Sequence, residues 1–350
     1  MYSINLSKYT TPENYELSEL PAPTVEAPKT SLSKSTQPVS IRSMLKRHLV
    51  FPYKISYDCA GTVAEIGPRV TRFKVEDEVF ARLPEFHRGA WSELTCRFEA
   101  NKPVYGRFSI ESVSSCDCFT GTPTVPRKPR GKNLYLYLLG LYRCIADAYL
   151  IAVSGTGLFA CQLAKNVFNA GKVISTVSTS KVPHVKELLG DSVVDEIIDY
   201  RKTDPKTAIP PQSVDFLFNT TGDPMTYLSL MRPTSVIVSI AILTSGDVLQ
   251  NSSLMRLSPE SNDRATVPFP IRIALNVLDR IRTIRASRRG VKYSAIFLEL
   301  NAKDLDSIRE WVDSGKLRTV VGTKVPYKDL EAVRKACKLY LARNVELENQ

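Results

Sequence analysis

The chain has 350 residues, of which 43% are hydrophobic and 24% charged, and its formal net charge is +11. This length allows about two domains with sizeable cores, and the composition is that of a globular protein rather than a disordered one. No apolar run reaches the ~18 residues of a membrane-spanning helix, so we expect no stable membrane insertion. The seven cysteines follow no disulfide or zinc-site spacing, and the first residues lack the apolar core of a signal peptide. Both features favour reduced thiols and a cytoplasmic location.

A turn between a strand and a helix is the most informative segment. Residues 148–153 are apolar and predict a buried strand, and an apolar-periodic helix follows and ends before Gly171. The turn between them consists of Ser154, Gly155, Thr156 and Gly157. Such a turn directs backbone N–H groups and a helix N-terminus at a diphosphate, although the full GxGxxG spacing is absent here. A plain structural turn is the alternative interpretation.

The end of the next predicted strand, residues 172–177, bears on which cofactor could bind. An acidic residue at this point would accept hydrogen bonds from a ribose and repel a 2′-phosphate, but none is present. Ser178, Ser180 and Lys181 follow instead, and hydroxyls with an ammonium suit a dianionic phosphate. A third strand, residues 196–200, ends in Tyr200, which we expect beside the same phosphate. These residues predict NADPH rather than NADH, and a solvated loop is the alternative.

Two more strands are predicted at residues 215–222 and 235–241. Strands that alternate with helical segments at this spacing indicate a parallel, doubly wound α/β sheet.

The positive charge is concentrated at residues 270–292, which contain six arginines. Apolar residues recur there at helical spacing: Ile271, Ile273, Leu275, Leu278, Ile281 and Ile284. We interpret this segment as a core helix with a solvated basic face, and binding to an anionic membrane is the alternative. No zinc-finger, helix-turn-helix or RNA-platform signature is present, so we expect no nucleic-acid partner.

Residues 51–68, 70–80 and 89–93 follow the pattern "G-x-D-x-A-G-x-V…G…V-x-x-F-x-x-G-D-x-V…G-A-x-A-E", with departures. With the segments 294–300, 304–316 and the helix from Tyr327, the chain resembles the medium-chain dehydrogenase/reductase superfamily. The resemblance is to its zinc-free quinone oxidoreductase and enoyl reductase branch, in its fungal form. It implies an α/β fold in which a GroES-like barrel catalytic domain accompanies a Rossmann doubly wound parallel sheet.

The implied domains are a GroES-like catalytic domain at 1–110, with an irregular connection at 101–147, a Rossmann NADP-binding domain at 148–290, and a return to the catalytic domain at 291–350. The resemblance also implies an NADPH-dependent oxidoreductase that reduces an activated C=C or a quinone by hydride transfer. Its partners would be a small-molecule enone, enoyl or quinone substrate and a second subunit in a homodimer.

Zinc is expected to be absent. Tyr57 stands where zinc-dependent relatives carry a histidine ligand, and the cysteines form no structural-zinc lobe. Tyr57 is a candidate proton donor in catalysis, and a packed core tyrosine is the alternative.

The chain departs from the family pattern at several places. Glu76 replaces the glycine of a Gly-Asp turn, which would be strained if the turn needs a positive φ. Residues 101–147 lack the helix that the family pattern leads us to expect. A translated intron or degeneration of the gene would explain why this helix is missing. A degenerate, non-catalytic paralogue that retains the fold, and with it nucleotide binding, is therefore the alternative function.

Overall fold

The computed structural model describes fifteen stretches of the chain, and these form two compact units. Unit 1 comprises residues 1–117, 253–265 and 321–350, and unit 2 comprises 118–252 and 266–320. The described stretches are 1–8, 11–21, 53–54, 58–66, 73–82, 90–98, 105–109, 123–124, 147–151, 155–252, 255, 264–298, 302–320, 325–326 and 328–338.

Unit 1 is built from two small antiparallel sheets. In the first, β1 (Tyr2–Leu6) lies between β2 (Glu16–Glu19) and β3 (Tyr53–Lys54). The second has the order β5-β4-β7-β6, formed by β4 (Asp58–Ile66), β5 (Glu78–Arg82), β6 (Leu94–Phe98) and β7 (Tyr105–Ser109). A 3₁₀ turn at Pro12–Asn14 and a helix at residues 330–338 complete the described part. The helix contributes Val333, which packs with the fully buried Ile4.

The turn before β5 confirms the strain expected at Glu76. The φ angle of Glu76 is 73°, in the left-handed region that favours glycine. The turn is held by hydrogen bonds from the Glu76 N–H to the Val63 carbonyl (2.8 Å) and from the Lys74 N–H to the Asp77 carboxylate (2.8 Å). These bonds fix the backbone there despite the cost of the side chain.

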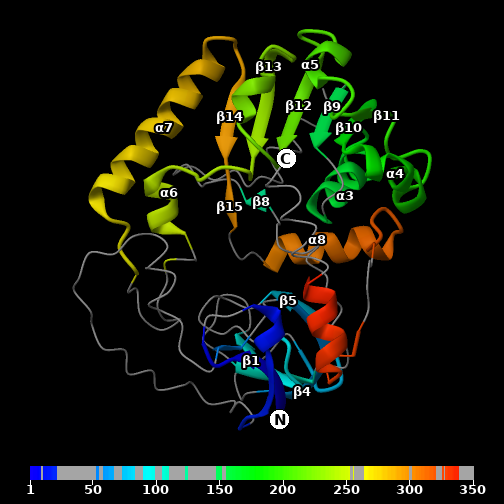
Figure 1. The fold of residues 1–350 in the computed structure, drawn as a ribbon, viewed down its shortest axis with the longest axis vertical. Helices are drawn as coiled ribbons and strands as arrows, with labels where there is room; N and C mark the ends of the chain where they lie inside the picture. Colours follow the sequence, from blue (N-terminus) through cyan, green and yellow to red (C-terminus); the bar gives the residue numbers. More distant parts are fainter. Residues whose placement is uncertain are drawn as a thin grey trace. The chain divides into compact units, whose positions relative to one another are not determined.

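Unit 2 contains a six-stranded sheet whose strands all pair in parallel (Figure 1). The order is β11-β10-β9-β12-β13-β14. The strands are β9 (Asp147–Ile151), β10 (Lys172–Val177), β11 (Glu196–Asp199), β12 (Val214–Asn219), β13 (Met231–Ser239) and β14 (Lys292–Ala295). The predicted parallel sheet is present, and β10 begins and ends at the predicted residues. A separate pair joins β8 (Pro123–Thr124) to β15 (Phe297–Leu298).

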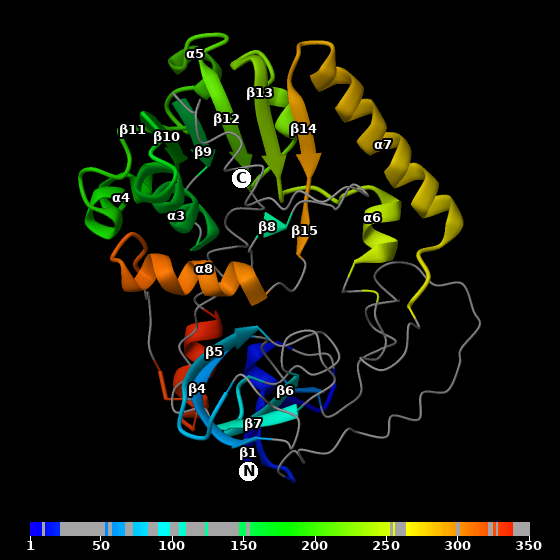
Figure 2. The ribbon, with the colours of Figure 1, turned by 180° about the vertical axis from the view of Figure 1, so that it is seen from behind.

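The helices of unit 2 flank this sheet (Figures 1 and 2). They are α3 (Gly155–Gln162), α4 (Val182–Leu189), α5 (Pro205–Ala208), α6 (Gly246–Asn251), α7 (Phe269–Ser287) and α8 (Ala302–Asp313), with 3₁₀ turns at Thr179–Lys181 and Pro224–Tyr227. The helix that begins at Gly155 continues after α3 as a π-helical turn, Leu163–Val167. Gln162, at this transition, is 2% exposed. Its side-chain amide donates to the Arg318 carbonyl (3.2 Å) and accepts from the Arg318 N–H (2.8 Å).

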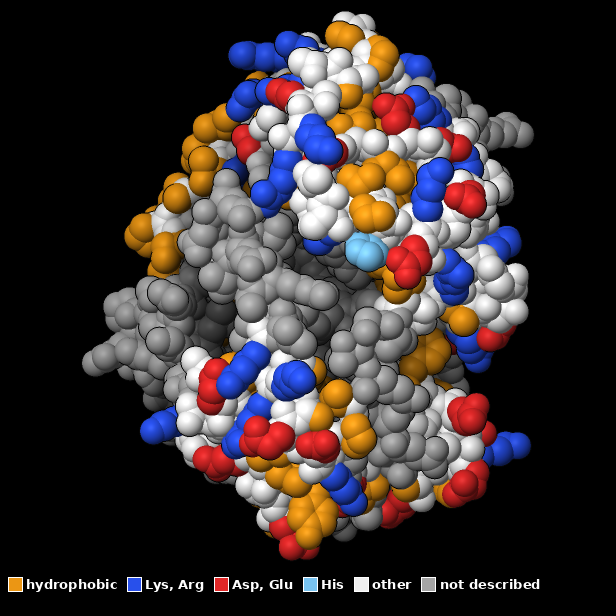
Figure 3. Space-filling view, turned by 45° about the vertical axis from the view of Figure 1, so that its right-hand side comes forward, with side chains coloured by type: hydrophobic (Ala, Val, Ile, Leu, Met, Phe, Trp, Pro, Cys, Tyr) orange, Lys and Arg blue, Asp and Glu red, His pale blue; other side chains and the backbone are white. Residues whose placement is uncertain are grey.

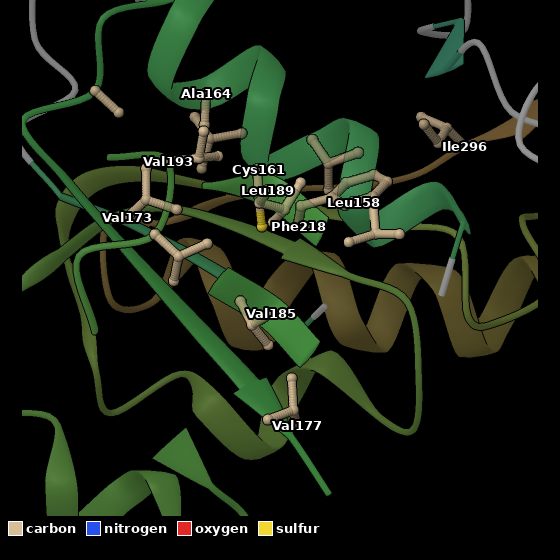
Figure 4. Close-up of a cluster of buried hydrophobic side chains, with 14 residues drawn as sticks. Leu158, Cys161, Ala164, Val173, Val177, Val185, Leu189, Val193, Phe218 and Ile296 are labelled. Carbon is tan, nitrogen blue, oxygen red and sulfur yellow. The ribbon is translucent and has the colours of Figure 1, made fainter. Parts of the chain in front are cut away.

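The largest buried cluster lies between α3, α4 and the sheet (Figure 4). Cys161 of α3, Val173 of β10 and Val185 of α4 are each fully buried in it. Burial raises the pKa of the Cys161 thiol to about 12, so the neutral thiol behaves as a small apolar side chain. Packing of these side chains fixes α3 and the loop between β10 and α4 to the same rigid body.

The structure corrects the interpretation of the basic segment as a core helix. Ile273, Leu278, Ile281 and Ile284 of α7 are exposed, each between 38% and 48%. Of the predicted apolar row, these four residues are exposed, whereas Ile271 and Leu275 are partly buried. The side of α7 that faces the rest of unit 2 carries polar contacts instead, as with Arg272 and Asn276, which both bind Asp247.

Candidate functional site

The carboxyl ends of β9 and β12 mark the point where the strand order reverses. The chain proceeds outward from β9 to β10 and β11, then returns to β12 and proceeds the other way to β13 and β14. In parallel sheets of this kind, ligands bind outside the strand ends at such a switch point. The residues that follow β9, β10 and β12 are therefore the first candidates for a binding site.

Three residues of the predicted glycine turn, Gly155, Thr156 and Gly157, form the start of α3. The helix begins at Gly155, and Gly157 is buried within its first turn while Thr156 is partly buried. The first N–H groups of a helix have no partner within the helix and carry its positive dipole end, which suits a diphosphate. Ser154 lies outside the described residues.

The polar residues after β10 are gathered into one short turn. Ser178 is buried, and its Oγ lies 3.5 Å from the Oγ of Ser180. The Lys181 N–H donates to the Ser178 carbonyl (2.8 Å), which closes the 3₁₀ turn that leads into α4. Two hydroxyls and an ammonium therefore belong to one rigid turn at a strand end, and the turn itself contains no carboxylate.

Tyr200 is brought to the same edge of the sheet by β11. Its N–H donates to the carbonyl of Val177, the last residue of β10 (3.1 Å), and its side chain is 43% exposed. The structure thus places Tyr200 next to the end of the strand that Ser178 follows. It brings together the turn residues and the tyrosine that the sequence singled out, while their role in binding stays a prediction.

Asp199 is a neighbour that the sequence argument did not weigh. Its Oδ1 accepts from the Arg201 N–H (3.1 Å), and its backbone carbonyl accepts from Thr203 (3.0 Å). Its other oxygen is buried, and the nearest cation is the Lys202 Nζ at 3.9 Å. The Asp199 carboxylate holds the turn that carries Tyr200. An aspartate at the end of a strand is the sequence signal that could have revealed this role.

A second polar group closes the ends of β12 and β13, and it too was missed from sequence. Asn219 is fully buried; its amide donates to the Thr221 carbonyl (2.6 Å) and accepts from the Ser239 hydroxyl (2.8 Å). The Ile240 N–H donates to the Asn219 carbonyl (3.0 Å). This network fixes the loop after β12 at the switch point. A polar residue at the end of an apolar strand was the available signal.

Tyr57, the candidate catalytic residue, lies outside the described residues. Within the ranges that the structure covers, no three His, Cys, Asp or Glu side chains converge as metal ligands would. In the same ranges, no helix combines the length and the apolar character that crossing a bilayer requires.

Comparison with known proteins shows that part of the chain is similar to one protein family. Residues 194–342 match the family model described as "Zinc-binding dehydrogenase". The match covers less than half of the chain. Tyr57 lies outside the matched range, so this match does not bear on the metal question.

Solved structures extend the likeness in fold to nearly the whole chain. The quinone oxidoreductase from Coxiella burnetii superposes with a TM-score of 0.60 at 17% identity and covers 98% of this chain and 96% of its own. The Escherichia coli quinone oxidoreductase complexed with NADPH gives a TM-score of 0.50 at 15% identity, with 98% and 97% covered. These matches confirm the predicted fold, in which a GroES-like domain accompanies a Rossmann domain.

The curated relatives are longer proteins, and the chain matches only part of each. The mitochondrial NAD(P)H oxidoreductase RTN4IP1 of Danio rerio is 24% identical over 283 residues, which are 77% of this chain and 65% of that protein. The chloroplastic NADPH-dependent alkenal/one oxidoreductase of Arabidopsis thaliana is 26% identical over 266 residues, 68% and 63% of the two chains. The chain thus spans less than two thirds of the length of these relatives.

Proposed function

We propose that this protein is an NADPH-dependent reductase of an activated C=C bond or of a quinone. The observation that carries the proposal is the turn after β10, which holds Ser178, Ser180 and Lys181 and contains no carboxylate. Tyr200 is bonded through its N–H to Val177, the residue before this turn. The names of the relatives support it, since they include an NADPH-dependent alkenal/one oxidoreductase and quinone oxidoreductases.

The described residues fit a dinucleotide phosphate in chemical type. The hydroxyls of Ser178 and Ser180 can donate to phosphate oxygens, and the Lys181 ammonium supplies the charge. The N-terminus of α3 at Gly155 would receive the diphosphate. When bound, NADPH would supply the hydride.

The chain's own task would be to hold the substrate carbonyl and to deliver a proton. Backbone N–H groups are suitable donors to the oxygen that becomes negative on hydride addition. Tyr57 stays the candidate proton donor. The proposal includes zinc-free chemistry, the domain limits at 110, 148 and 290, and a cytoplasmic location. The domain limits can be tested by limited proteolysis and the location by cell fractionation.

Cofactor binding is the first test. Lys181→Ala should weaken NADPH binding at least about tenfold, because a charge-assisted contact to phosphate contributes about 1.5–3 kcal/mol. NADH binding should stay nearly unchanged. Titration calorimetry of both cofactors measures the two effects, and Lys186→Ala is a matched control because Lys186 is an exposed lysine on the following helix. Equal losses for the two cofactors would show that Lys181 does not contact the 2′-phosphate.

Turnover is the second test. The purified protein should oxidise NADPH in the presence of small enones or quinones, and exhaustive chelation should leave the rate unchanged. Zinc-dependent oxidation of simple alcohols would refute the zinc-free assignment. Binding of NADPH without turnover of any acceptor would favour the non-catalytic paralogue.

A further inference from the structure

The exposed side of α7 carries six large apolar side chains, which we call the α7 stripe. Their exposed fractions are Phe269 73%, Ile273 45%, Val277 51%, Leu278 47%, Ile281 48% and Ile284 38%. Orange side chains line the upper left edge of Figure 3, over α7. At about 100° per residue, all six positions fall within one half of the helix circumference. Single apolar side chains are normal on a surface, whereas a row along a whole helix marks an interaction site.

The opposite side of α7 attaches the helix to its own unit, so the stripe is not exposed by loose packing. The Asn276 side chain donates to the Asp247 carboxylate (2.9 Å) and accepts from the Asp247 N–H (3.1 Å). A methyl group on Gly246 of α6 would overlap the backbone of Arg272, so the two helix backbones are in direct contact. Ala286, near the end of α7, is fully buried. These contacts fix α7 at both ends with the stripe exposed.

The charges beside the α7 stripe are all positive. The middle of the stripe is a row about 80° wide that consists of Ile273, Val277, Ile281 and Ile284. Arg280 and Arg285 flank this row, one on each side, and both are exposed. Arg288 and Arg289, also exposed, extend the positive charge past the end of the helix. Asp279, the one acidic residue of α7, is half-buried and lies about 160° from the centre of the row.

We propose that α7 docks in the plane of an anionic lipid surface, with its stripe at the boundary between headgroups and acyl chains. Helices that lie in this boundary combine an apolar face with arginines or lysines on the polar side. The stems of Arg280 and Arg285 can lie along the apolar boundary while their guanidinium groups reach lipid phosphates. Four arginines within α7 exclude a helix that crosses the bilayer, so the docking is peripheral.

The charge pattern favours lipid over another α7 helix as the occupant of the stripe. No exposed position of α7 carries a carboxylate, so a second copy of the helix would offer Arg280 and Arg285 no ion-pair partner. An anionic leaflet offers a phosphate to each of these arginines. Its negative surface potential also attracts a chain whose formal net charge is +11. The apolar row and the arginines on both of its sides are therefore satisfied by the same surface.

Sedimentation of the full chain with vesicles tests the proposal. The wild type should bind vesicles of equal parts phosphatidylcholine and phosphatidylserine at least about tenfold more tightly than vesicles of phosphatidylcholine alone. Val277→Glu should weaken binding to the mixed vesicles about tenfold or more, because it places a carboxylate in the stripe. Val312→Glu is the matched control: it makes the same change at a position 40% exposed on α8 and should leave binding within about twofold. A wild type that stays in the supernatant, or equal losses in the two variants, would overturn the proposal.

Arginine variants test the role of the charges with the same mixed vesicles. Arg280→Gln and Arg285→Gln should each weaken binding by about fivefold, because each arginine near an anionic surface adds to the attraction. Arg309→Gln removes the same charge from an exposed position on α8 and should change binding by less than about twofold. Similar losses for all three variants would show that the protein is attracted by its net charge alone, and would overturn the assignment to α7.

Fluorescence tests whether the stripe itself enters the lipid. Leu278→Trp adds one tryptophan to the two of the chain, and the wild type supplies the background signal. The emission of the variant should shift to shorter wavelengths with the mixed vesicles but not with phosphatidylcholine alone, and an unshifted emission would overturn the proposal. Light scattering tests the other occupant. A molar mass that halves in Val277→Glu, with a wild type that does not bind vesicles, would assign the stripe to a second copy of the chain instead.

Discussion

The helices α4 and α7 lie at opposite ends of the same sheet and treat their apolar sides in opposite ways. α4 buries Val185 and Leu189 against the sheet and exposes His184, Lys186 and Glu187. α7 directs Arg272 and Asn276 to Asp247 and exposes three of its isoleucines, Ile273, Ile281 and Ile284. The comparison teaches that periodicity identifies an apolar stripe but not the surface that buries it. α4 buries its apolar side chains within the fold of the chain, whereas Ile273, Leu278 and Ile281 of α7 stay exposed.

The same substitution on the two helices should have very different costs. Leu189→Ala in α4 should reduce the free energy of unfolding by about 2–4 kcal/mol, because it opens a cavity in the core. Leu278→Ala in α7 should change it by less than about 0.5 kcal/mol in dilute protein, because this side chain is 47% exposed. Urea denaturation at low protein concentration measures both. Similar losses for the two variants would mean that Leu278 is buried within the single chain.

The backbone contact between α6 and α7 should also be sensitive. Gly246→Ala should destabilise the protein by about 1–3 kcal/mol, because the new methyl group meets the backbone of Arg272 and the helices must separate. Asn251→Ala, at the exposed end of α6, is the control and should be nearly neutral. Thermal unfolding monitored by circular dichroism compares the two, and a neutral Gly246→Ala would contradict the tight attachment of α7.

The smallest expected effects concern two carboxylates, Asp195 just before β11 and Asp279 in α7. Their pKa values are shifted in opposite directions. Burial alone would raise the pKa of Asp195, but hydrogen bonds from Lys165 and the Val173 N–H outweigh burial and lower it. Partial burial raises the pKa of Asp279, a residue of α7, more than Arg282 lowers it. A lowered pKa stabilises the fold above the unfolded-state pKa, and this stability is lost as the pH falls. A raised pKa costs stability as the pH rises through the folded-state value.

At neutral pH, Asp195→Asn should therefore destabilise the protein and Asp279→Asn should stabilise it. Each change should be below about 1 kcal/mol, because solvent screens both groups. Both differences should shrink as the pH falls. That of Asp279 should shrink first because its pKa is raised, and that of Asp195 only below the ordinary aspartate value of about 3.9. Urea midpoints measured across this pH range check the signs, and two shifts of the same sign would contradict the environments described here.

The sequence predicted those parts that local chemistry determines. The β-branched run of β10 set both of its ends, and the glycines after β9 set the start of α3. The strain at Glu76 followed from a turn that usually carries glycine. The Asn219–Ser239 pair was not predicted, because it joins residues on two strands whose alignment depends on the whole sheet. The roles of Ser178, Ser180, Lys181 and Tyr200 stay predictions, since their proximity does not itself identify a ligand.

The amide of Gln162 also bears on the order in which the chain folds. Its bonds to Arg318 join residues 156 positions apart. Closure of so long a loop costs entropy that a single pair of hydrogen bonds does not offset, so the surrounding sheet must form first. The segment at Arg318 is then among the last to be fixed during folding. A contact made this late mainly slows unfolding, so Gln162 contributes to the lifetime of the folded protein more than to the speed with which it is reached.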